Sequence, residues 1–287
     1  MILMSKDYLP FESILLIDGN NLIHRNFHAF PFLTSKDGTP TGAVYGTLKM
    51  IKNFQERFNP MLITFCLDAR RKSFRNDLYS DYKANRPETD DLLKPQFALI
   101  EEFCEASKLP YIKIEGYEAD DLIGSLAFKA LEQGYLPYIL SGDRDLFQLV
   151  SKSIKMIYIS TKEGLVVYDE EKVRERFGGL SPKQIVDLKG LQGDTSDNIP
   201  GVKGIGEKTA IALLSQYGTM EGIYENIESI KGKRKENLIN EKDIAFLSRE
   251  LARIKCDIDV DLIEKNDFSF DYPEVKEFLA KLNIVSL

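Results

Sequence analysis

Cysteine and histidine are scarce in this chain. Among its 287 residues are three cysteines, Cys66, Cys104 and Cys256, and two histidines. The cysteines are far apart and form no C-x-x-C pair, which excludes a disulfide framework and a zinc-thiolate site and predicts a reducing, cytoplasmic location. Any bound metal must then be a hard ion held by oxygen ligands, such as Mg²⁺ or Mn²⁺.

Long apolar runs and excess positive charge are also missing. No run approaches the about 20 residues that a membrane-spanning helix needs, and no basic stretch precedes the short apolar start, so we expect neither a secretory signal nor a membrane partner. The 38 basic and 45 acidic residues give a net charge of −7. Taken alone, this balance argues against a nucleic-acid partner, because phosphates attract basic surfaces.

The first two thirds of the chain alternate between strand-like and helix-like segments. Continuous apolar runs suit strands buried on both faces of a sheet, and they lie at 14–17, 61–67 and 136–140. Two further short strands are expected within 154–169. Helical patterns separate the runs, at about 43–57, 92–107 and 119–133. The alternation predicts an α/β fold with a mostly parallel central sheet flanked by helices.

From Ser181-Pro182 onward the pattern is helical, with a serine suited to cap a helix and a proline suited to its first turn. We therefore expect a boundary near residue 180. An α/β core is predicted for 1–180 and a helical region for 181–287.

Each buried strand is followed by carboxylates. Asp18, Asp68 and Asp143 end the three apolar runs, and Asp145 follows two residues later. Ligands of open α/β sheets bind outside the carboxyl ends of the strands, so we expect these side chains to share one crevice. Converging carboxylates repel one another and need cations to stay ionised. Two divalent ions between carboxylates are typical of phosphoryl transfer, in which one ion activates water and the other stabilises the leaving oxygen.

Two more acidic groups are candidates. The segment 118–121, Glu-Ala-Asp-Asp, begins a predicted helix, where acids also serve as ordinary caps. Asp194 and Asp197 are three residues apart, which places them on one face of a helical turn or in a loop. His24 and His28 are four apart and are interpreted as packing residues.

Two segments have features of nucleic-acid binding. Residues 201–210 carry glycines in the order G-x-x-G-x-G between Lys203 and Lys208, which predicts a helix-hairpin-helix turn that offers backbone amides to phosphate. Residues 70–86 contain six basic against two acidic residues, a local charge of +4, with three aromatics that can stack on bases. The basic cluster at 231–235 is interpreted either as a DNA contact or as a solvated turn.

These motifs together resemble one family. In chain order they are Leu16–Asn20, Phe65–Asp68, Phe74-Arg75, Tyr82–Arg86, Gly116–Asp121, Gly142–Asp145, Gly193–Asn198 and Gly201–Ala210. The chain resembles the 5′-nuclease domain of bacterial DNA polymerase I and, more widely, the flap-endonuclease superfamily. The resemblance implies a PIN-like sheet and a helical arch at about 70–110. It places a helix-hairpin-helix motif of the helix–two-turn–helix type at about 193–217.

The resemblance also implies the metal ligands. One group consists of Asp18, Asp68, Glu118 and Asp120, and a second of Asp145, Asp194 and Asp197. Asp143 lies between the groups, and Asp121 is either a ligand or a support behind them. The implied cofactors are two or more Mg²⁺ ions, for which Mn²⁺ substitutes, and a K⁺ ion at the hairpin turn.

The implied DNA contacts come from the arch and the hairpin. Lys83 stabilises charge on the scissile phosphate, Arg86 clamps it and Tyr82 stacks on a base, with Phe74 and Arg75 nearby. The hairpin residues that grip the duplex are Lys203, Gly204, Gly206 and Lys208.

The implied activity is that of a structure-specific 5′-nuclease, a monomer that acts on 5′ flaps, nicks and RNA–DNA primer junctions in replication and repair. It combines 5′→3′ exonuclease and flap endonuclease cleavage and leaves a 5′-phosphate. Two alternatives stay open, a PIN-like ribonuclease and a catalytically silent binder of branched DNA.

Overall fold

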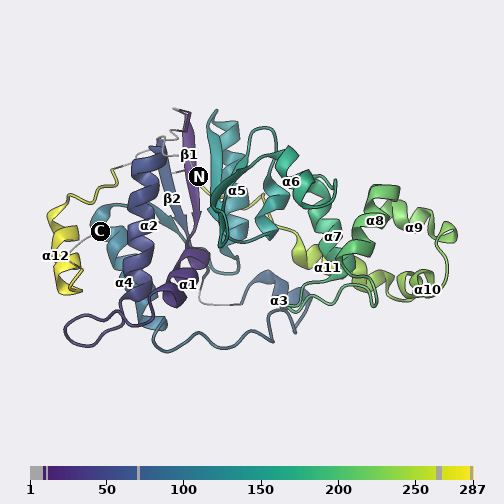
Figure 1. The fold of residues 1–287 in the computed structure, drawn as a ribbon, viewed down its shortest axis with the longest axis horizontal. Coiled ribbons are helices and arrows are strands. Elements are labelled where there is room, and N and C mark those ends of the chain that lie inside the picture. Colours follow the sequence, from purple (N-terminus) through teal and green to yellow (C-terminus); the bar gives the residue numbers. More distant parts are fainter. Residues whose placement is uncertain (1–8, 11, 70–71, 263–266, 285–286) are drawn as a thin grey trace.

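A six-stranded sheet lies at the centre of the molecule (Figure 1). The computed structural model describes residues 9–10, 12–69, 72–262, 267–284 and 287. The strand order is β3-β2-β1-β4-β5-β6, with β1 to β5 parallel and β6 antiparallel to β5. The bounds are β1 Ser13–Asp18, β2 Leu62–Cys66, β3 Tyr111–Ile112, β4 Leu136–Ser141, β5 Lys155–Ser160 and β6 Gly164–Tyr168. The predicted mostly parallel sheet is therefore confirmed.

The central part of strand β1 is apolar on both faces because helices cover both sides of the sheet. Ile14 and Leu16 pack on one face against α5 (Ala119–Glu132), whereas Leu15 and Ile17 pack on the other. Side chains alternate between faces along a strand, so a continuous apolar run is what two covered faces require. The helices of the apolar cluster on the second face are α1 Gly19–Ala29, α2 Gly42–Phe58, α4 Lys94–Ser107 and α12 Pro273–Lys281, of which α12 packs against α4.

The remaining helices are α3 Phe74–Leu78, α6 Glu170–Arg176, α7 Ile185–Gln192, α8 Glu207–Tyr217, α9 Met220–Glu225, α10 Lys233–Asn240 and α11 Lys242–Ala252. Helices α7 to α11 extend from the sheet toward the right of Figure 1, whereas α12 lies at the left. Three short 3₁₀ helices are η1 Asp145–Leu149, η2 Pro182–Gln184 and η3 Ile227–Ser229. Within the described residues, no helix is both long and apolar enough to cross a bilayer.

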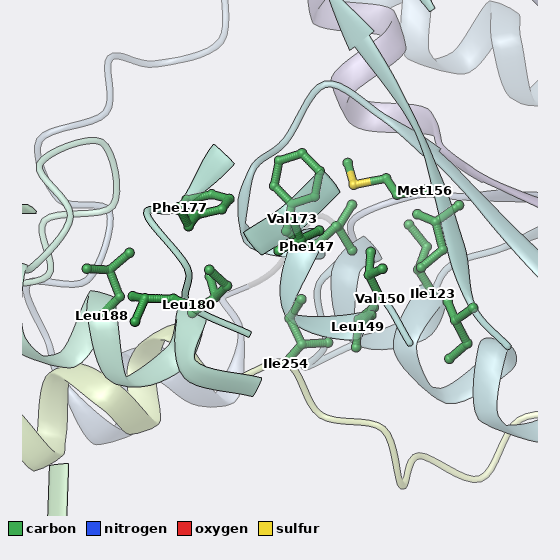
Figure 2. Close-up of a cluster of buried hydrophobic side chains, with 14 of the residues drawn as sticks. Ile123, Phe147, Leu149, Val150, Met156, Val173, Phe177, Leu180, Leu188 and Ile254 are labelled. Atoms are coloured by element: carbon green, nitrogen blue, oxygen red, sulfur yellow. The ribbon is translucent and has the colours of Figure 1, made fainter. Parts of the chain in front are cut away.

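One apolar core runs through residue 180. Figure 2 shows Phe147, Phe177 and Leu180 packed in the same cluster as Leu188 of α7. That cluster continues from the sheet into α8, where Leu214 is fully buried. The helical region is thus built directly onto the α/β core rather than connected to it by a linker.

The predicted arch is shorter than expected. The span 70–110 includes α4, whose Ile100 and Phe103 are fully buried and which packs between α2 and α12. This part is therefore a core helix, and the prediction that it belongs to an arch is wrong. The part that remains for an arch is 72–93, and Arg70 and Arg71 lie outside the described residues.

Candidate active site

A cleft opens where β1, β2 and β4 end at the same edge of the sheet. It brings together six of the nine predicted metal ligands with Lys83 and Arg86. Its walls are Asp18, Asn20, Asn21, His24, Asp68, Lys83, Arg86, Pro87, Glu118, Ala119, Asp120, Asp143 and Asp197. Asp121, Asp145 and Asp194 are not among these residues.

Asp18 ends β1 and caps α1. One carboxylate oxygen accepts a hydrogen bond from the Asn21 N–H at 3.0 Å, and the other accepts one from Ser141 Oγ at 2.6 Å. The same serine oxygen accepts from the Asp143 N–H at 2.9 Å. The ends of β1 and β4 are thereby joined, which sets Asp18 and Asp143 on one side of the cleft.

Asp68 follows β2 and connects it to α5. Its carboxylate accepts from the Ala119 N–H at 2.7 Å and from Asn20 Nδ2 at 2.9 Å. The first of these bonds satisfies a free amide at the start of α5. It brings Glu118 and Asp120, which flank Ala119, to the edge of the same cleft.

Four carboxylates in the cleft have no basic partner among the described residues. No described lysine or arginine lies within ion-pair distance of Asp18, Asp68, Asp120 or Asp143. Burial, together with the charge of Asp143, raises the pKa of Asp18 to about 7 and raises that of Asp120 well above its usual range. Such oxygen donors fit a divalent cation, because its charge removes the repulsion that raises these pKa values.

No three described acidic, histidine or cysteine side chains are close enough to hold one ion as they stand. Two cleft carboxylates, Glu118 and Asp197, are instead engaged by cations of the chain itself. Lys83 Nζ lies 2.8 Å from Glu118, and Arg86 pairs with Asp197. Burial alone raises the pKa of Glu118, but Lys83 and Arg75 outweigh it and lower the pKa.

Lys83 is held in the cleft by its backbone as well. Its N–H donates to the Asp197 carbonyl at 2.9 Å, and its φ of 56° lies in the left-handed region. Asn85 and Asn198 add further bonds between this segment and the turn at 194–198. The predicted position of Lys83 inside the site therefore follows from a contact between segments over 100 residues apart.

Tyr82 does not fit the expected role of stacking on a base. Only 4% of its surface is exposed, and its hydroxyl lies 3.1 Å from Glu118 and 3.2 Å from Asp197. Tyr82 thus supports the carboxylates from behind. Phe74 is half-buried beside the ring of Tyr117, with the Lys255 ammonium 4.5 Å from its ring centre.

Arg75 and Asp121 pair with each other, so Arg75 does not fit its expected DNA contact, and of the two alternatives for Asp121 the structure favours the support. Arg75 is 2% exposed, and its guanidinium makes two bonds to Asp121, at 2.7 and 2.8 Å. It also donates to the carbonyls of Leu251 and Arg253. A fully buried carboxylate used in this way supports the ligands of α5 and is not free to bind metal, and a buried arginine cannot reach DNA.

The turn containing Asp194 and Asp197 is not helical. Asp194 and Ile199 exchange backbone hydrogen bonds of 2.9 and 2.8 Å around a tight loop, so of the two alternatives left open the loop is correct. The two carboxylates have different cationic partners. Asp197 faces Arg86 in the cleft, whereas Asp194 pairs with Lys189, which also contacts Asp145.

The predicted hairpin turn connects α7 and α8. Gly201 and Gly204 have φ angles of 62° and 75°, which favour glycine. Lys203, Gly204, Gly206 and Lys208 are all exposed. The turn rests on Asn237, which donates to the Lys203 carbonyl at 2.7 Å. These residues are placed as a phosphate contact requires.

Sequence reasoning missed several residues of the site. Asn20 and Asn21 follow Asp18 directly, so their place in the capping turn was a usable signal. His24 lies one helical turn further and lines the cleft, where burial, His28 and Arg86 lower its pKa. Ser141 and Lys189 carry no recognisable pattern, because only long-range contacts bring them to the carboxylates.

Two family models cover most of the chain. The model of the 5′-3′ exonuclease N-terminal resolvase-like domain matches residues 13–178, and the model of the 5′-3′ exonuclease C-terminal SAM fold matches 180–276. The chain belongs to the 5′-3′ exonuclease family. The resemblance to the nuclease domain of DNA polymerase I is confirmed with it, as is the fold of a PIN-like sheet followed by a helical region.

Relatives of this chain are found as separate proteins and as parts of longer ones. A 5′-3′ exonuclease of Buchnera aphidicola is 42% identical over 265 residues, covering 90% of this chain and 86% of that protein. DNA polymerase I of Bacillus caldotenax is 43% identical over 255 residues, 88% of this chain. The match spans only 29% of that polymerase.

Solved structures share the fold. T5 5′-exonuclease with bound zinc ions superimposes with a TM-score of 0.66 at 24% identity, covering 84% of this chain and 89% of that one. The catalytic core of Rad2 in complex with DNA substrate gives 0.62 at 17% identity, covering 95% and 88%. At these identities the likeness shows a common architecture.

Proposed function

We propose that this exonuclease is a divalent-metal-dependent, structure-specific 5′-nuclease that cleaves 5′ flaps and removes nucleotides 5′→3′ from DNA. The observation that carries the proposal is the cleft at the carboxyl ends of β1, β2 and β4, where oxygen ligands face Lys83 and Arg86. When bound there, divalent ions supply Lewis acidity for water and for the leaving 3′-oxygen. The product then keeps a 5′-phosphate.

The chain's own residues perform the remaining tasks. Lys83 and Arg86 neutralise the scissile phosphate, exchanging Glu118 and Asp197 for phosphate oxygens. Asn20 and Ser141 fix the orientation of Asp68 and Asp18. Lys203 and Lys208, with the exposed amides at the start of α8, contact the duplex backbone without reading its sequence.

Finer assignments are part of the same proposal. The site prefers Mg²⁺, with Mn²⁺ as a substitute, and a K⁺ ion binds at the hairpin turn. The protein acts as a cytoplasmic monomer in replication and repair on flaps, nicks and RNA–DNA primer junctions. The segment 72–93 serves as the arch, and the functional boundary lies near residue 180.

Cleavage of matched substrates tests the activity. We expect a 5′-flap DNA to be cut at the junction in Mg²⁺, with little cleavage of an unstructured single-stranded RNA of the same length. Asp143→Ala is the inactive control, because it removes a cleft carboxylate and leaves the hairpin lysines intact. Preference for the RNA supports a PIN-like ribonuclease. Flap binding in Ca²⁺ without cleavage in Mg²⁺ supports a silent binder.

A further inference from the structure

Lys189 places a positive charge between two of the carboxylates assigned to metal. Its ammonium lies 2.6 Å from Asp145 and also pairs with Asp194. The three side chains are 14%, 16% and 13% exposed, so water screens the cluster only weakly. This sets it apart from an ordinary surface ion pair, whose charges are mostly solvated.

The backbone of α7 holds Lys189 in this place. The neighbouring Gly190 packs so closely on α9 and α11 that an added Cβ would lie 2.8 Å from Met220 Sδ and 3.1 Å from the Ala245 carbonyl. The helix cannot shift away without breaking these contacts. Only the flexible side chain of Lys189 can withdraw from the carboxylates.

The carboxylates of the cleft differ from Asp145 and Asp194 in their basic partners. Within the described residues, no lysine or arginine lies within ion-pair distance of Asp18, Asp120 or Asp143, whereas Asp145 and Asp194 share Lys189. In the first group Lys83 pairs with Glu118 alone, so a divalent ion still meets the unpaired charges of Asp18 and Asp120, whereas in the second group one ammonium contacts both Asp145 and Asp194. The Coulomb attraction for the ion is weaker at this pair because the ammonium lies between its two carboxylates.

We propose that Lys189 is a positioning residue that acts as a tethered cation. It holds Asp145 and Asp194 together while no second ion is bound, and it must withdraw before an ion fills this group. Lys189 thus makes filling sequential, with the group around Asp18 occupied first. The inference rests on the proposed function, because it takes Asp145 and Asp194 as metal ligands.

Metal titration of the full chain tests the inference. Mn²⁺ binding is followed by electron paramagnetic resonance in the wild type and in Lys189→Met, Lys189→Arg and Lys113→Met. The matched control is Lys113, which pairs with Glu101 outside the cleft. We expect the wild type to bind Mn²⁺ in a tight and a weak phase. In Lys189→Met alone, the Kd of the weak phase should fall about tenfold, because a carboxylate pair without an ammonium between its members attracts the ion more strongly. A Lys189→Met titration that superimposes on the wild type overturns the inference.

A second measurement needs no substitution at Lys189. Acetylation of lysines in the wild type, read by mass spectrometry, is compared without metal and in saturating Mg²⁺. We expect Lys189 to become at least about fivefold more reactive with Mg²⁺, as its ammonium leaves the carboxylates, while Lys113 is unchanged. Equal protection of Lys189 in both conditions overturns the inference alone. A wild type that binds no Mn²⁺ and cleaves no flap overturns the proposed function, and this inference with it.

Discussion

At Asp18, the charge that a metal site needs lowers the stability of the metal-free fold. Its carboxylate is 4% exposed, and burial, assisted by the charge of Asp143, raises its pKa to about 7 from the ordinary value of 3.8. The folded state therefore holds the proton more tightly than the unfolded state. This stabilising contribution is fully present below about pH 4 and is lost as the pH rises through 7.

We expect Asp18→Asn to stabilise the metal-free protein at pH 8 by on the order of 2 kcal/mol, because the amide has no charge to bury. The gain should shrink toward pH 5, and Mg²⁺ should stabilise only the wild type. Urea unfolding at pH 5 and pH 8, with and without Mg²⁺, measures both effects. Asp169→Asn is the control, since Asp169 caps α6 outside the cleft. A gain of equal size at both pH values would contradict the assignment.

The position of Lys83 favours a role in the cleavage step over a role in DNA binding. Its ammonium is 23% exposed and faces Glu118 inside the cleft, so it reaches a phosphate only when that phosphate enters the site. We expect Lys83→Met to lower the single-turnover cleavage rate about 100-fold or more, with the Kd for flap DNA changed by less than about threefold. Lys72→Met, exposed beside the same segment, is the control and should leave the rate nearly unchanged. A loss confined to Kd would make Lys83 a simple phosphate contact.

At the scale of elements, a buried ion pair joins three helices around the cleft. Arg75 in α3 pairs with Asp121 in α5 and bonds to the carbonyls of Leu251 in α11 and of Arg253 just after it. Asp121 also accepts from the backbone N–H of Lys255 at 2.9 Å. The base of the segment 72–93 is thereby fixed to the helix that begins at the metal ligands.

We expect Arg75→Met to lower the free energy of unfolding by about 3–5 kcal/mol, because it leaves Asp121 buried and unpaired. The double variant Arg75→Met/Asp121→Leu should recover part of that loss. Urea unfolding of both variants measures this, and Mn²⁺ binding to the double variant tests whether Asp121 is a ligand. If the double variant still binds Mn²⁺ tightly, Asp121 serves as the partner of Arg75. If tight binding is lost, Asp121 is a metal ligand.

Elements with a characteristic local residue pattern can be predicted from the sequence, whereas elements that depend on pairing with distant residues cannot. The strands β1, β2 and β4 are recognisable because burial on both faces makes them apolar over most of their length. The hairpin turn was recognisable from its glycines. The two-residue strand β3 was not, since it exists only through pairing with β2. The sequence leaves the turn at 194–199 open between a helical turn and a loop, because the bonds that close it join backbone atoms and leave no pattern of side chains.

The same distinction applies to the site. Carboxylates at strand ends identified the cleft, because parallel strands bring their carboxyl ends to one edge. Arg75 was assigned to DNA from its place in a basic segment. Its burial depends on α11, over 170 residues away, and no local pattern reveals it.

At the scale of the whole molecule, charge is segregated. Nine of the 45 acidic residues belong to the predicted ligand set, which leaves 36 acidic against 38 basic residues elsewhere. The net charge of −7 is therefore no argument against a DNA partner, because much of it lies where divalent ions can neutralise it. The exposed hairpin lysines lie outside this cleft, Lys203 on the turn between α7 and α8 and Lys208 in the first turn of α8.

The salt dependence of DNA binding should therefore depend on the basic residues outside the cleft. The Lys203 side chain is exposed, and within the described residues no acidic side chain forms an ion pair with it. We expect Lys203→Ala to reduce the slope of log Kd against log salt by about 0.9, the value for one lost phosphate contact, with the single-turnover rate on bound flap DNA unchanged. Lys276→Ala, on α12 at the opposite end of the molecule in Figure 1, should leave the slope unchanged. Equal slopes in all three proteins would exclude the hairpin turn from the duplex contact, because a phosphate contact cannot be lost without releasing fewer counterions.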